Sequence, residues 1–218
     1  GGANNVAVKI AADNVTVNGF SISNPTGSYG VSAQGRSNIT VDYNIISNVG
    51  NNVNGSGPSY GIQFESNATA SNVNFVRNCV SNIHGGQNGA TNSGNGSGVG
   101  IGANSSNSTN NLSGLNISYN VISGISASTF NGTGGKGAYG VIINVGAAVS
   151  GTGQAISPVI TNNVISALNG RWAHGIGLEG DCPGALVTNN SMTGFSSIAG
   201  DNVGVRIEDN DGAGTVQI

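Results

Sequence analysis

Ser37-Asn-Ile-Thr-Val-Asp-Tyr-Asn-Ile-Ile-Ser-Asn-Val49 is a segment that recurs along the chain, and this recurrence decides the fold. It returns as Ser71-Asn-Val-Asn-Phe-Val-Arg-Asn-Cys-Val-Ser-Asn-Ile83, then over residues 114–125, 157–168 and 184–195, with an earlier copy at 13–24. A second segment precedes most copies, as in Tyr29-Gly-Val-Ser-Ala and Tyr60-Gly-Ile-Gln-Phe. Each pair of segments therefore forms one repeating unit, or rung.

Apolar residues alternate with polar ones inside both segments, which indicates strands because successive side chains of a strand point to opposite faces. We expect Tyr29, Val31 and Ala33 to point inward from the first strand of a rung. The second and third strands would contribute pairs such as Ile39 with Val41 and Ile46 with Val49, and this pattern repeats in the later rungs. The sequence predicts an all-β, right-handed parallel β-helix of about seven rungs with three short strands each, forming one domain over residues 1–218.

One polar position recurs at the bend between the second and third strands. Rungs stacked at about 4.8 Å bury their apolar faces against one another. Asparagines stacked in a column can hydrogen-bond along the stack, which satisfies buried polar groups. The first rung has Phe20 there, so we expect the column to stop before it. The column is formed by Asn44, Asn78, Asn120, Asn163 and Asn190.

These repeats resemble the parallel β-helix repeats of the pectate-lyase-like superfamily. The copy at Asn14 to Asn24 is especially similar to the Asn-Val-Thr-Val-x-Gly-Phe-x-Ile-Ser-Asn repeats of archaeal and bacterial surface proteins. The resemblance covers nearly the whole chain and implies the fold. It does not imply one function, because lyases, hydrolases, adhesins, tailspikes and surface-layer proteins share this architecture.

Superfamily members that cleave polysaccharides resemble one another in carrying acids and bases on the outer face of the first strand. Here we expect Gly30 and its counterparts, followed by Ser32 and its counterparts, to point outward and to leave that face smooth and nearly uncharged. His174 aligns with Tyr29, and we expect it to be a stacked core residue. No residue is assigned a catalytic role, and the expectation leans away from an enzyme. If it is an enzyme, a polysaccharide lyase or glycoside hydrolase is expected.

Acidic side chains gather near the C-terminal end of the sequence. Carboxylate oxygens in short Asp-x-Asp-Gly turns often bind calcium. We therefore consider a Ca²⁺ site, with a solvated acidic turn as the alternative, and no cofactor is required. The candidate metal ligands are Glu179, Asp181, Glu208, Asp209 and Asp211.

Arg171 and Trp172 form a second candidate site, because tryptophan and arginine stack on sugars or anchor protein interfaces. The alternative is that both side chains fold over the edge of the rung. Cys79 and Cys182 lie about three rungs apart, too far for a disulfide within the chain. Several Asn-x-Ser/Thr sequons are candidate glycosylation sites: Asn54, Asn67, Asn95, Asn104, Asn107 and Asn131.

The amino-acid composition limits the classes of partner that we expect for this chain. Charged residues make up 7% of the chain, and the net charge is −3, which argues against a nucleic-acid partner. No apolar run is long enough to span a membrane. The sequons and the repeat resemblance favour an extracellular or cell-surface location.

We see no capping helix at either end of the repeats, so either the chain is a piece of a longer β-helix or it self-associates, with copies stacking end to end or packing side by side; we expect self-association. The predicted function is an extracellular structural subunit of a surface layer, sheath or filament. The alternative is a β-helix protein that binds or cleaves polysaccharide, using the Trp172 region with Glu179 and Asp181.

Overall fold

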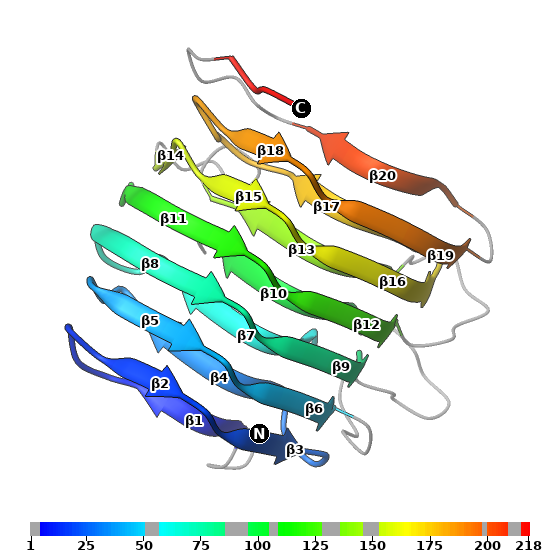
Figure 1. Cartoon of the computed structure of the whole chain (residues 1–218), viewed down its shortest axis with the longest axis horizontal. Helices are drawn as coiled ribbons and strands as arrows, with labels where there is room; N and C mark the ends of the chain where they lie inside the picture. The colour runs from blue at the N-terminus through cyan, green and yellow to red at the C-terminus, as the bar shows by residue number, and fades with distance from the viewer. Residues whose placement is uncertain are drawn as a thin grey trace.

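The computed structural model describes residues 5–50, 57–85, 96–104, 109–127, 136–145, 153–197, 200–208 and 215–218. Within these residues every regular element is a strand, and the strands stack in order along one axis (Figure 1). Each turn of the chain adds a strand to each of three parallel sheets, which we name sheets A, B and C. The predicted all-β parallel solenoid is confirmed.

Sheet A contains the first strand of every rung. Its seven strands pair in the order β1-β4-β7-β10-β13-β17-β20, which agrees with the predicted number of rungs. Their bounds are β1 Val6–Ile10, β4 Tyr29–Gln34, β7 Ser59–Glu65, β10 Gly98–Asn104, β13 Gly137–Asn144, β17 Trp172–Leu178 and β20 Asn202–Ile207.

Sheets B and C contain the second and third strands, and each B strand leads through a short bend into a C strand (Figure 1). Sheet B consists of β2 Thr16–Asn18, β5 Ile39–Asp42, β8 Ala70–Val76, β11 Leu112–Ser118, β15 Val159–Thr161 and β18 Leu186–Thr188, with β14 Ala155–Ile156 pairing with β11. Sheet C consists of β3 Ser21–Asn24, β6 Ile45–Val49, β9 Cys79–His84, β12 Val121–Ser126, β16 Val164–Gly170 and β19 Ser191–Ser197.

The core runs along the axis between the three sheets. Predicted inward residues such as Val31, Ile39 and Ile46 are fully buried, and their counterparts lie in register in the rungs above. Each rung alone would leave these side chains in water, and stacking removes them from it. The pattern of sheets B and C, with apolar residues inward, therefore matches the sequence-based prediction.

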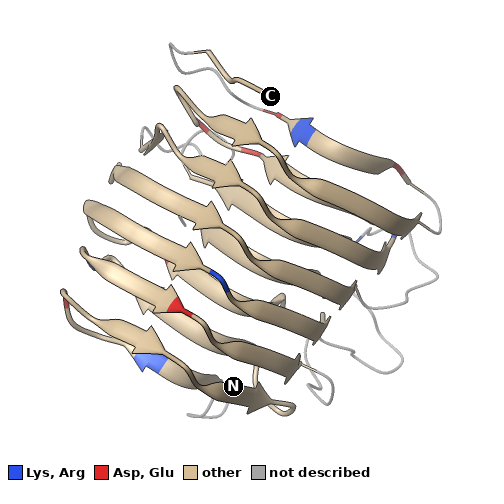
Figure 2. Cartoon of the chain, viewed as in Figure 1, with Lys and Arg blue, Asp and Glu red and all other residues tan. Residues whose placement is uncertain are grey.

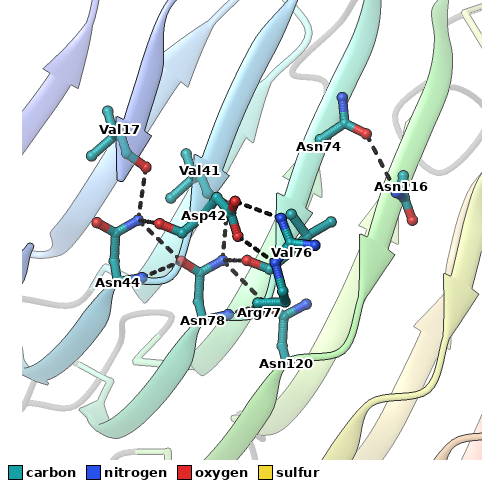
Figure 3. A network of polar contacts seen from close by, with 10 residues as sticks. All are labelled: Val17, Val41, Asp42, Asn44, Asn74, Val76, Arg77, Asn78, Asn116 and Asn120. Atoms are coloured by element: carbon teal, nitrogen blue, oxygen red, sulfur yellow. Dashed lines mark hydrogen bonds and ion pairs between the residues drawn. The ribbon is translucent and has the colours of Figure 1, made fainter. Parts of the chain in front are cut away.

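The predicted asparagine column lies at the bend between sheets B and C (Figure 3). The side chain of Asn44 donates to Oδ1 of Asn78 at 3.1 Å, and Asn78 donates to Oδ1 of Asn120 at 3.1 Å. Each amide also donates to a backbone carbonyl of the preceding rung, as Asn78 does to Val41 at 2.9 Å. Phe20 is 59% exposed, so the column ends before it as predicted.

The first strands differ from the prediction, because their glycines face the core and their tyrosines face outward. A Cβ at Gly30 would lie 2.6 Å from Cγ2 of Ile46, inside the core. Tyr60, in contrast, belongs to a separate cluster outside the main core. In the pairing of β4 with β7, Tyr29 pairs with Tyr60 and Val31 with Ile62, and the glycine between them is left out of the register. The two-residue alternation is therefore interrupted at the glycine, and the side chain of Val31 also faces the core. The expected smooth glycine face is wrong, as is the expected inward column that begins at Tyr29.

Candidate functional site

The outer face of sheet A carries an aromatic column. The rings of Tyr29 and Tyr60 stack with centroids 5.7 Å apart, and the rings of Tyr139 and His174 meet edge to face at 5.2 Å. Val99 lies between the two pairs and is 1% exposed. Parallel in-register pairing thus places these residues, from five successive rungs, in one continuous row.

A second column on the same face is polar, and its residues lie at or directly after the last residue of each strand. Gln34 pairs in register with Glu65, and Asn104 pairs with both Glu65 and Asn144. Glu179 and Glu208 extend the same position, because the residues directly before them, Leu178 and Ile207, continue the register from Ile143. The column is therefore made of six polar residues: Gln34, Glu65, Asn104, Asn144, Glu179 and Glu208.

One glycine on this face makes room for the larger side chain beside it. The ring of Tyr60 lies over Gly102, where a Cβ would approach Cε1 of Tyr60 to 2.6 Å. The absence of a side chain at position 102 therefore lets Tyr60 fold down against the sheet.

His174 lies at the centre of a polar cluster and is fully buried. Its Nε2 lies 3.3 Å from Nη1 of Arg206. A guanidinium can only donate, so Nε2 accepts and the proton of the neutral ring is on Nδ1. Nδ1 faces Oε1 of Glu179 at 3.8 Å, beyond hydrogen-bond distance, and it has no hydrogen-bond partner among the described residues. His174 is buried and its ring contacts that of Tyr139, as expected, but it faces outward from sheet A and not toward the core.

The charges around His174 are partly paired. Arg206 forms an ion pair with Glu208. Burial raises the pKa of the Tyr139 hydroxyl, and the charge and hydrogen bond of Glu179 raise that pKa further. The Tyr139 phenol therefore stays protonated next to the imidazole. The arrangement brings two carboxylates, one imidazole and one guanidinium together.

Within the described part of the chain, two buried oxygens of the polar column lack hydrogen-bond partners. They are Oδ1 of Asn104 and Oδ1 of Asn144, on adjacent rungs. The amide nitrogen of Asn104 donates to the hydroxyl of Tyr60 at 3.1 Å, which fixes which end of this amide remains unsatisfied. A buried acceptor without a partner costs about 1–3 kcal/mol. Such atoms are typical of positions that water or a ligand completes.

Arg171 and Trp172 lie elsewhere. Trp172 opens β17, and the guanidinium of Arg171 lies 5.4 Å from the centroid of its indole ring. Glu179 follows the other end of the same strand, so about 20 Å of extended chain separates it from Trp172. The structure therefore does not bring the predicted Trp172 and Glu179 into one site.

Some of the predicted metal ligands lie within the described part of the chain and others lie outside it. Among the described residues, no group of three or more His, Cys, Asp and Glu side chains is placed to hold a metal ion. Glu208 is engaged by Arg206, and Glu179 faces His174. Asp209 and Asp211 lie outside the described residues, so a Ca²⁺ site that includes them stays a prediction.

The glycosylation candidates also divide. Asn67 is exposed, whereas the side-chain nitrogen of Asn104 is already hydrogen-bonded to Tyr60. Asn54, Asn95, Asn107 and Asn131 lie outside the described residues. Cys79 is exposed and Cys182 is buried, and no disulfide joins them.

Comparison with protein families, curated proteins and solved structures gives no match to this chain. Within the part of the chain that is described, no helix is long and apolar enough to cross a membrane. The candidate site is thus defined by its own geometry. Sequence reasoning missed Tyr139, His174 and Arg206, and the signal that could have found them is the glycine that interrupts the alternation in each first strand.

Proposed function

We propose that this chain is an extracellular protein that binds a polysaccharide along the outer face of sheet A. One observation carries the proposal: the half-buried rings of Tyr29 and Tyr139 share the outer face of sheet A with a column of half-buried polar side chains that includes Asn104, Asn144 and Glu179. Sugar rings offer hydroxyls to such polar side chains and flat faces to tyrosines. The extracellular location is part of the proposal and is supported by the exposed sequon at Asn67.

The charge and hydrogen-bonding character of the face point to a class of polysaccharide. The unsatisfied amide oxygens need donors, and the carboxylates of Glu65, Glu179 and Glu208 outnumber the guanidinium of Arg206. A polyuronate would add negative charge and offer carboxylates where donors are needed. A neutral glycan or an amino-sugar polymer satisfies both requirements, because it presents hydroxyls or ammonium groups.

A structural role was favoured by the sequence because the outer face of the first strands was expected to be smooth. That face instead carries Tyr139, His174 and Glu179, so this reason for preferring a structural role falls away. The proposal concerns binding. Cleavage would appear in the same experiments as release of reducing or unsaturated sugar ends, which would identify a glycoside hydrolase or a lyase.

The test is calorimetric titration of the protein with neutral, amino-sugar and uronic-acid oligosaccharides. We expect binding of a neutral or amino-sugar oligomer, and an approximately tenfold loss of affinity in Glu179→Gln, which removes one charge-assisted hydrogen bond. Asp201→Asn is the matched control, because Asp201 is exposed and its contact with Ala173 is through its backbone carbonyl, which accepts from the N–H of Ala173. Preference for polyuronates, or equal affinity in Glu179→Gln, would contradict the proposal.

A structural subunit of a surface layer, sheath or filament is the second candidate. The observation that favours it is the exposed apolar side chains of Ile45, Val121 and Val164 on the outer face of sheet C. Electron microscopy of the purified protein would then show ordered assemblies. Dispersed single particles at high protein concentration would rule out this second candidate.

A further inference from the structure

The outer face of sheet C carries an apolar column that is bounded at both ends. Ile45 is 55% exposed, and Val121 and Val164 are each 46% exposed. Cys79, also exposed, lies between Ile45 and Val121 in register. The same position holds serines in the rungs below and above, Ser21 and Ser191. The apolar character is therefore confined to four consecutive rungs.

The bend residues beside this column are unusually large for their backbone conformation. Tyr43, Arg77 and Tyr119 have φ angles of 53°, 53° and 59°, in the left-handed region. Bulky residues adopt this region only at a cost of about 1–2 kcal/mol, whereas glycine and asparagine adopt it readily. The equivalent bends of other rungs do use Gly19 and Asn162. Large side chains at these strained positions of the middle rungs indicate that their exposed surfaces contact another molecule.

The charge of Arg77 is neutralised locally. Its Nε and Nη2 donate to the two carboxylate oxygens of Asp42 at 2.9 and 2.6 Å (Figure 3), and its guanidinium lies 4.5 Å from the ring centroid of Tyr43. Charged residues are few over the rest of the sheets (Figure 2). A second molecule can therefore approach this surface without facing an unpaired charge.

The column is flanked by large residues on one side and small residues on the other. Tyr43 lies two residues before Ile45, and Ser47 lies two residues after it. The same spacing relates Arg77 and Ser81 to Cys79, and Tyr119 and Ser123 to Val121. The serines pair in register from rung to rung. A two-fold axis along the column would exchange its two sides, so each large residue of one copy would face a serine of the other.

We infer that this column is the centre of an interface with a second copy of this chain, with the two stacks parallel and related by that two-fold axis. An isologous interface requires a self-complementary patch, and exchange of large and small flanks supplies one. A two-fold axis across the stack at Cys79 would instead bring the two Arg77 side chains together. The parallel arrangement avoids that contact and faces Cys79 with Cys79.

The exposed apolar area is sufficient for a dimer. Tyr43 and Tyr119 are each 60% exposed. Taking about 150–250 Å² per aromatic side chain and about 60–120 Å² per aliphatic one, the two tyrosines with Ile45, Val121 and Val164 expose roughly 300–450 Å². A standard interface buries about 800 Å² per partner, of which roughly 57% is apolar. Cys79 and the stem of Arg77 add to the patch, so its apolar area matches this requirement.

Thiol cross-linking tests the contact directly, because Cys79 is exposed and Cys182 is fully buried. The purified protein is treated with a copper–phenanthroline oxidant, and dimers are measured on a non-reducing gel. We expect a disulfide-linked dimer from the wild type and none from Cys79→Ser. The matched control is Asn116→Cys in the Cys79→Ser background, since Asn116 lies on the outer side of sheet B. Equal cross-linking at position 116 would overturn the inference.

Single cysteines at other rungs test the orientation. In the Cys79→Ser background, Val121→Cys and Val164→Cys should each cross-link as efficiently as Cys79 if the axis runs along the column. Cross-linking at position 79 alone would overturn the parallel arrangement.

Sedimentation provides a measurement without cross-linking. Val121→Asp should weaken dimerisation at least tenfold without lowering the melting temperature of the monomer, and Asn116→Asp should not weaken it. A wild type that stays monomeric at every concentration would overturn the inference. That result would leave glycan binding untouched, because the proposed glycan face is on sheet A.

Discussion

Asn78 and Asn120 are joined by two hydrogen bonds to one atom. The side-chain amide of Asn78 donates to Oδ1 of Asn120 at 3.1 Å, and the backbone N–H of Asn78 donates to the same oxygen at 2.9 Å. Asn120 itself is fully buried and donates to the carbonyl of Phe75 at 2.8 Å. One oxygen therefore satisfies two donors of the rung below, which couples the stability of adjacent rungs.

Replacement of Asn120 by alanine should destabilise the fold by about 2–4 kcal/mol, because it removes these bonds and takes away the oxygen that accepts from the buried backbone N–H of Asn78. Urea unfolding followed by circular dichroism measures the change. Asn116→Ala is the control, since that partly buried side chain donates one hydrogen bond within the described residues, to Oδ1 of Asn74 at 3.3 Å. A cost below about 0.5 kcal/mol at Asn120 would mean that the column contributes little to stability.

Gly100 faces the core, so Gly100→Ala should lower stability by about 1–3 kcal/mol through overpacking. The added Cβ would lie 2.5 Å from Cγ2 of Ile122 and 2.6 Å from the carbonyl oxygen of Gly140. Gly57→Ala is the control, because a Cβ there meets nothing within 4 Å. Thermal unfolding of both variants gives the comparison. An unchanged melting temperature for Gly100→Ala would restore the outward orientation of the glycines.

Tyr60 should make stability depend on alkaline pH. Burial, followed by the neighbouring Tyr29, raises the pKa of the Tyr60 hydroxyl to about 12, from 10.0 in an unfolded chain. Below pH 10 both states hold the proton, so this group adds no pH dependence. Between pH 10 and 12 the unfolded chain releases the proton more readily, and stability therefore falls. Urea midpoints across this range should show a steeper decline in the wild type than in Tyr60→Phe, and identical slopes would exclude this role.

The two cysteines should differ in reactivity. Burial, followed by the charge of Asp181, raises the pKa of the Cys182 thiol to about 12, and the thiolate is the reactive form. A thiol-specific chromogenic reagent at pH 8 should label one site per native chain, at Cys79, and two after denaturation. Mass spectrometry of the labelled peptides checks the assignment. Rapid labelling of Cys182 in the native protein would show that its surroundings open.

The recurrence of the segment at Ser37 to Val49 was enough to predict three strands per rung, a continuous apolar core and the asparagine column. These features follow from local patterns, because alternation selects strands and repetition selects stacking. The first strands were harder to predict. Tyr29-Gly30-Val31 looks like simple alternation, yet both Gly30 and Val31 face the core.

The sequence by itself determined the stacked parallel architecture, because each rung repeats the same apolar positions and none can bury them alone. Only the tertiary structure decided which side chains of sheet A face outward and form the candidate site. Position 30 faces inward and must be glycine, because the side chain of Ile46 on a strand of another sheet occupies the space that a Cβ would need. That packing turns Tyr139 and His174 outward and brings His174 against Arg206. Contacts between rungs, rather than any motif within one rung, thus assemble the candidate site.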